Sequence, residues 1–126
     1  MKSKHISHIY SLKEGIENLS VFPEWTWIYA ESELESVTYE TTCYILTENS
    51  RDFTDEENDK REEELGENGL EILFSKQQLE DILANAKQRD LNEDKIEESI
   101  DYYVFNDAFL PEWTNESEQG SGGNVG

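Results

Sequence analysis

Residues Ser36–Thr47 read SVTYETTCYILT, and the expected fold depends on this stretch. Its β-branched and aromatic residues alternate with polar ones at a period of two, which is typical of a β-strand. One parity carries Val37, Tyr39, Cys43 and Ile45, and the other carries Thr38, Glu40, Thr42 and Tyr44. The alternation predicts a strand over Ser36–Thr47 with one face in a hydrophobic core.

Two further segments, one on each side of this stretch in the sequence, also predict strands. Trp25–Glu31 reads WTWIYAE, and both of its alternating faces are largely apolar, as in a central strand. Leu70–Phe74 reads LEILF, a short apolar run that predicts a buried strand. The simplest topology pairs Trp25–Glu31 with Ser36–Thr47 as antiparallel strands, because only a short acidic turn separates them.

Three segments predict helices, and each follows a residue that can cap a helix N-terminus. Leu12–Leu19 follows Ser11, with Glu14 at capping-box spacing. A second helix follows Ser75, and a third follows Asn92. This order of helices and strands predicts an α+β fold, in which a small, mostly antiparallel sheet packs against helices.

An acidic insert, Arg51–Gly69, interrupts the pattern. It holds nine acidic residues, and its apolar residues are Phe53 and Leu65, so we expect it to project from the sheet with little core contact. Two alternatives are open for its structure. It is either a mobile acidic loop or an exposed helix over Asp55–Leu65, which Thr54 would cap.

The length of 126 residues fits one domain, which we place at residues 1–111 with Pro111 at its end. Residues 112–126 contain the run GSGG and predict a flexible tail. No apolar run approaches the ~20 residues of a membrane-spanning helix. No apolar segment follows the basic residues at the N-terminus, as a signal peptide requires. With Cys43 as the single cysteine, these features predict a cytoplasmic protein without disulfides.

The sequence marks no catalytic, cofactor or metal site, so we do not expect an enzyme. Cys43 lies on the inward parity of its strand among apolar and anionic neighbours, which favours a buried structural thiol. His5 and His8 lack further ligands at metal-site spacing. The acidic run that starts at Asp55 has Lys60 where a calcium loop needs glycine.

Charge is the strongest functional signal. Thirty acidic against ten basic residues give a formal net charge of −20, more than solubility alone requires. A folded polyanion of this size is suited to rapid binding of a positively charged protein, such as a nuclease. Direct binding of nucleic acid is disfavoured because no basic patch with interleaved aromatics occurs.

Two groups of residues are the candidates for contact with such a partner. On the helix after Asn92, acids cluster opposite the apolar stripe, and Tyr102 lies on its flank beside them. The first group is therefore Asp94, Glu97, Glu98, Asp101 and Tyr102. The second group belongs to the insert and consists of Asp55, Glu56, Asp59, Glu62 and Glu63.

Several short pieces between Trp25 and Phe109 resemble small acidic bacterial proteins, among them immunity proteins of contact-dependent growth inhibition and related polymorphic toxin systems. These pieces are WTWIY from Trp25, TTCYIL from Thr41, DILANAKQ from Asp81, and YY from Tyr102 with NDAF up to Phe109. The resemblance implies an α+β fold and a role as an immunity protein that binds and neutralises a cognate basic toxin. A nuclease toxin is the expected class, since nucleases carry basic clefts. The alternative is a nucleic-acid mimic that inhibits a DNA- or RNA-processing enzyme through rows of carboxylates.

Overall fold

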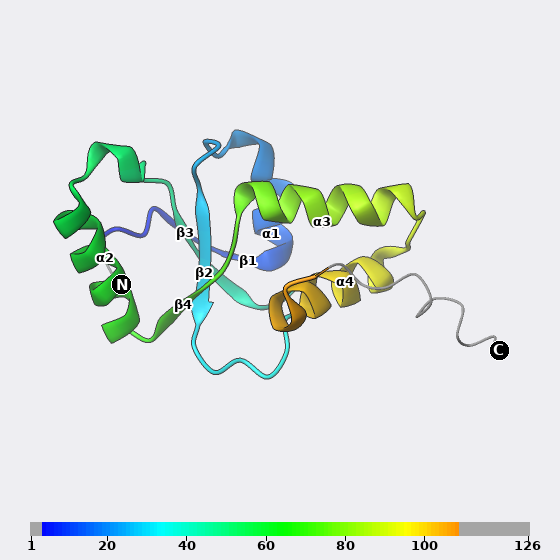
Figure 1. Ribbon diagram of the computed structural model, residues 1–126. Coiled ribbons are helices and arrows are strands. Elements are labelled where there is room, and N and C mark those ends of the chain that lie inside the picture. The colour runs from blue at the N-terminus through cyan, green and yellow to red at the C-terminus, as the bar shows by residue number, and fades with distance from the viewer. Residues whose placement is uncertain (1–3, 109–126) are drawn as a thin grey trace.

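The computed structural model of this protein describes residues 4–108. The predicted tail and the predicted domain end at Pro111 lie outside the described residues. Residues 4–108 form an antiparallel sheet with helices packed on both of its faces, which confirms the predicted α+β fold (Figure 1).

The sheet has the strand order β1-β3-β2-β4, and every neighbouring pair is antiparallel. Its strands are β1 (His8–Ser11), β2 (Trp27–Glu31), β3 (Thr42–Leu46) and β4 (Leu70–Ser75). The predicted pairing of the central strands is confirmed, with Ile28 opposite Ile45. Strand β1 was not predicted, because HIYS is short and its polar and apolar residues follow no clear alternation.

The four α-helices begin directly after the residues that were predicted to cap them. The helical elements are α1 (Leu12–Glu17), η1 (Leu19–Val21), η2 (Ser50–Asp52), α2 (Asp55–Glu67), α3 (Lys76–Gln88) and α4 (Glu93–Asn106), where η denotes a 3₁₀ turn. Reciprocal capping boxes start α1, α2 and α3, and the Asn92 side chain caps α4. The acidic insert is therefore mostly a helix, and the loop alternative is wrong.

The two faces of the sheet belong to separate hydrophobic cores. Ile28, Ile45 and Phe74 pack with side chains of α1, α3 and α4. Successive residues point to opposite faces, so Tyr29 and Tyr44 lie in the other core, together with Leu65 of α2. Because Leu65 is fully buried, the expectation that the insert has little core contact is wrong.

The predicted strand Ser36–Thr47 is wrong in its first half. Only Thr42–Leu46 pairs in the sheet, and the preceding residues form a turn that crosses to α4. Val37 is nevertheless buried in the core with α4 residues such as Ile100. The apolar residues at alternate positions, which suggested a strand, are therefore explained in this half by burial of a loop. Carboxylates of α4 accept hydrogen bonds from the backbone of that loop.

Candidate protein-binding surface

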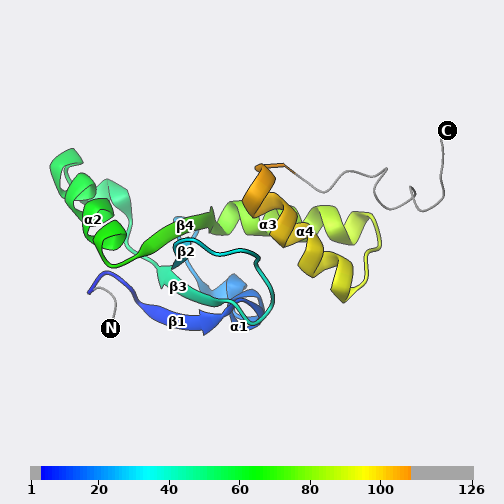
Figure 2. The ribbon, with the colours of Figure 1, turned by 90° about the horizontal axis from the view of Figure 1, so that it is seen from below.

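The two groups of predicted contact residues lie at opposite ends of the molecule. Figures 1 and 2 show α2 beyond one end of the sheet and α4 at the other, in both views. The acids of α2 and α4 therefore do not form one continuous anionic surface. Each group has to be judged by what its own side chains contact.

In α4, acids of the first group bind the chain itself. The Asp101 carboxylate accepts a hydrogen bond from the Val37 N–H at 2.6 Å, and the Glu97 carboxylate accepts one from the Tyr39 N–H at 2.8 Å. Both acids are half-buried. These two predicted contact residues therefore form part of the junction between α4 and the loop before β3.

The hydroxyl of Tyr39 strengthens the same junction by donating to the Glu93 carbonyl oxygen at 2.8 Å. Burial, followed by the nearby charges of Glu93, Glu97 and Asp94, raises the pKa of Tyr39 above its usual value. The phenol consequently stays protonated and can keep donating this bond. These contacts fix the loop before β3 against α4.

The other members of the α4 group are more accessible. Asp94 and Glu98 are exposed, and Glu98 forms an ion pair with Lys95 at 3.1 Å. Tyr102, the aromatic member of the group, is half-buried. Among the large apolar residues of α4, Phe105 is exposed, at 50%. Phe105 was not among the predicted contact residues, although helical spacing places it far from the Ile96/Ile100 stripe.

In α2, the second group forms what we name the acidic flank: Asp55, Glu56, Asp59, Glu62 and Glu63, all exposed. At 3.6 residues per turn these side chains fall within a sector of about 120° of the helix surface. Within residues 4–108, none of these carboxylates forms an ion pair. The negative charge of the acidic flank is therefore left for solvent or a partner to neutralise.

The cationic residues of α2 lie outside the acidic flank. Lys4, Lys60 and Arg61 line an open cavity of about 420 Å³, and the acids Asp52, Glu57 and Glu64 line it too. The guanidinium of Arg61 lies over the Phe53 ring, 4.7 Å from its centroid. The side of α2 away from the acidic flank therefore carries both signs of charge, whereas the acidic flank carries only negative charge.

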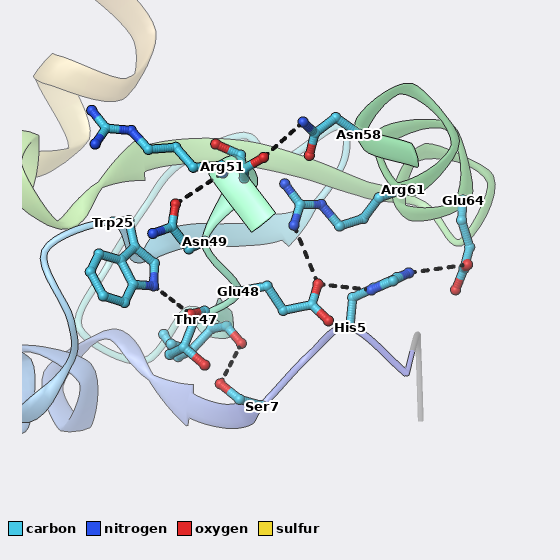
Figure 3. A network of polar contacts seen from close by, with 12 residues as sticks. His5, Ser7, Trp25, Thr47, Glu48, Asn49, Arg51, Asn58, Arg61 and Glu64 are labelled. Atoms are coloured by element: carbon cyan, nitrogen blue, oxygen red, sulfur yellow. Dashed lines mark hydrogen bonds and ion pairs between the residues drawn. The ribbon is translucent and has the colours of Figure 1, made fainter. Parts of the chain in front are cut away.

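A polar network holds α2 in this orientation (Figure 3). The carboxylate of Glu48 contacts Arg61 at 3.3 Å and His5 at 2.8 Å, and the other ring nitrogen of His5 lies 3.6 Å from Glu64. Arg61 is only 5% exposed, which is unusual for arginine. Arg61 and Leu65, one turn apart, therefore anchor the inner face of α2 and turn the acidic flank outward.

Nucleophilic and metal chemistry find no support in the described residues. Cys43 is buried, and burial raises the pKa of its thiol from 9.0 to about 12, so the thiolate that attacks electrophiles is scarce. Residues 4–108 hold no group of three His, Cys, Asp or Glu side chains arranged to bind a metal ion. In the same range, no helix is long and apolar enough to cross a membrane.

Fold and surface together define a small acidic α+β domain that exposes a uniformly anionic helix flank. Residues 9–112 match a family described as a domain of unknown function (DUF7716), and the chain belongs to that family. The match begins at the second residue of β1 and spans the rest of the sheet and all of the helices described above. No curated protein and no solved structure matches the chain.

Proposed function

We propose that this protein is an immunity protein that binds and neutralises a cognate basic toxin, with a nuclease toxin as the expected class. The observation that supports the proposal is the acidic flank of α2, whose exposed carboxylates have no cationic partner in residues 4–108. Like charges three and four residues apart on a helix repel one another. A cationic surface would relieve that repulsion on binding.

The geometry favours α2 over α4 as the contact surface. Glu97 and Asp101 already accept backbone hydrogen bonds, so a partner that engaged them would first have to displace the loop. A partner could contact the acidic flank without displacing any part of the chain, because Leu65 and Arg61 anchor α2 from the opposite side. Long-range attraction by the net charge of −20 would accelerate encounter, and the flank would set the orientation of the complex.

The alternative, a nucleic-acid mimic, needs long rows of carboxylates that follow a phosphate backbone at ~3.4 Å per strand step. The acidic flank spans Asp55 to Glu63, about 12 Å at the helical rise of 1.5 Å per residue. Two α4 acids that would have lengthened the pattern bind the loop instead. The two functions differ in breadth, because a mimic inhibits several related enzymes and an immunity protein inhibits one toxin.

Co-expression with the protein encoded immediately upstream tests the proposal. We expect the two proteins to co-purify and the full chain to protect cells from the toxicity of its partner. The double variant Glu62→Lys, Glu63→Lys should lose both properties. The matched control Glu17→Lys, Glu40→Lys makes the same charge change at exposed positions outside α2 and should keep them. Equal protection by both double variants would overturn the assignment of the surface, and failure of the unaltered chain to bind or protect would overturn the function.

A further inference from the structure

A hollow of about 250 Å³ lies at the edge of the sheet, between β4, the turn that follows β2, and the last turn of α4. Apolar side chains that include Ile72, Val104 and Phe105 line it, and Glu31, Glu33 and Glu71 also contribute to its wall. We name this feature the edge hollow. It is separate from the acidic flank and from the α4 contacts that bind the loop.

The apolar part of the edge hollow is unusually open to solvent. Phe105 of α4 and Ile72 of β4 both border the hollow, and they are 50% and 45% exposed. A single exposed apolar side chain is ordinary, whereas apolar side chains that share a hollow with a polar rim are typical of a binding hot spot. The edge hollow therefore has the anatomy of a small protein-binding site.

The rim is entirely anionic. Glu31, Glu33 and Glu71 are exposed, and none of them forms an ion pair with another residue in the range 4–108. The Tyr44 hydroxyl donates to the Glu31 carboxylate at 3.1 Å, which positions that group. Charge complementarity therefore selects an occupant that carries lysine or arginine beside an apolar side chain.

The backbone beside the edge hollow offers a second recognition element. β4 lies at the edge of the sheet and pairs with β2 on one side, and no strand in residues 4–108 pairs with its other side. Edge strands present N–H and C=O groups with which an extended segment can pair. Leu73 interrupts the register between β2 and β4, so Glu71, Ile72 and Leu73 all reach the wall of the hollow.

We infer that the edge hollow binds an extended cationic segment of the basic partner, which pairs with β4 and inserts one apolar side chain beside Val104 and Phe105. Lysine or arginine side chains on either side of that residue meet Glu31, Glu33 and Glu71. The inference rests on the proposed function, since it supplies that partner with a second contact. The acidic flank accelerates encounter, and the edge hollow contributes the short-range fit that distinguishes one cationic partner from another.

The chain's own residues 109–126 are the competing occupant. They include Glu112, Glu116 and Glu118 and contain no lysine or arginine. Like charges would therefore oppose their docking against the anionic rim. Charge complementarity favours a segment from another protein.

The probe for this inference is the peptide acetyl-KTKLKTK-amide, titrated into isotope-labelled full chain and followed by NMR. We expect saturable shifts at the amides of Glu71, Ile72 and Phe105. A peptide with glycine in place of leucine should bind at least ~tenfold more weakly, as should the Phe105→Ser variant with the leucine peptide. The control Val21→Ser removes a side chain that is 74% exposed but outside the hollow, and it should bind normally.

A second variant separates binding from folding. Glu33 has a φ of 67°, in the left-handed region that glycine adopts without strain. Glu33→Gly thus removes a rim charge without adding backbone strain, and we expect weaker peptide binding with an undiminished melting temperature. Equal binding of the leucine and glycine peptides, or NMR contacts between Ile72 and residues 109–126 in the free chain, would overturn the inference. If the upstream-encoded protein binds through the acidic flank and ignores Phe105→Ser, the inference fails while the proposed function stands.

Discussion

The side-chain carboxylate of Asp101 in α4 accepts a hydrogen bond from the backbone N–H of Val37, which lies 64 residues earlier in the chain, at 2.6 Å. Val37 is buried, so water cannot readily replace the carboxylate as an acceptor. The contact explains why a stretch with a strand-like sequence leaves the sheet. It also converts an acid that looked available to a partner into part of the fold.

Asp101→Ala should lower the free energy of unfolding by about 1–3 kcal/mol, because a buried N–H loses its charged acceptor. Asp101→Asn retains an acceptor oxygen and should recover much of that loss. Urea unfolding measures the stability, and hydrogen exchange should show faster exchange of the Val37 amide in the alanine variant. The control Glu98→Ala removes an exposed acid of α4 with a surface ion pair and should cost well under 1 kcal/mol. Equal losses for Asp101→Ala and Glu98→Ala would contradict this account.

Replacement of Asp59 in the acidic flank should stabilise the protein. Asp59 lies four residues from both Asp55 and Glu63, and each such like-charge pair costs about 0.2–0.5 kcal/mol. Asp59→Asn should therefore raise the free energy of unfolding slightly at low salt. Asp55→Asn is the matched control, since Asp55 lies in the first helical turn, where the helix dipole favours an acid. A gain for Asp59→Asn that persists undiminished in high salt would show that charge repulsion is not its cause.

Arg61 and Lys60 are adjacent cations of α2 with opposite surroundings. Arg61→Ala should cost about 2 kcal/mol or more, because it removes a buried guanidinium that contacts Glu48 and covers the Phe53 ring. Lys60→Ala makes the same change in charge at an exposed position and should stay within about 0.5 kcal/mol of the parent. Denaturant unfolding of both variants decides the matter. Similar losses of unfolding free energy for Arg61→Ala and Lys60→Ala would show that the network does not hold α2 in place.

The thiol of Cys43 makes stability depend on alkaline pH. Its pKa rises to about 12 in the folded chain, so the folded state keeps a proton that the unfolded state releases near the usual value. This contribution is complete below the unfolded pKa, and it falls by up to about 1.4 kcal/mol per pH unit between that value and the folded pKa. Cys43→Ala should lose stability less steeply over that range. The tyrosines with raised pKa values are present in both proteins. If the unfolding free energy of the parent and of Cys43→Ala fell equally steeply with pH, the raised pKa of Cys43 would be contradicted.

Local chemistry predicted much of this fold. Three helix starts were predictable from capping boxes, which depend on residues only three positions apart. The capping residues are Ser11, Thr54 and Ser75. The first half of Ser36–Thr47 could not be predicted in the same way, because its N–H groups find acceptors on a helix more than 50 residues later in the chain.

The site shows the same division between local and distant information. Helical spacing brought the exposed acids of α2 together, and it also places Phe105 away from the apolar stripe of α4. It could not show that Arg61 is buried against Glu48, or that Phe105 and β4 border one hollow. Those pairings depend on how separate elements pack, which a single sequence does not contain.

The association rate constant with the upstream-encoded partner, measured over a range of salt concentrations, tests the central claim most directly. For the unaltered chain we expect a rate well above the ~10⁵–10⁶ M⁻¹s⁻¹ of uncharged encounter at low salt, and a steep fall as salt is added. Glu62→Lys, Glu63→Lys should slow association at least ~tenfold and flatten the salt dependence, whereas Glu17→Lys, Glu40→Lys should change both much less. Equal rates and equal salt dependence for the two double variants would contradict the claim that the acidic flank of α2 meets a basic partner.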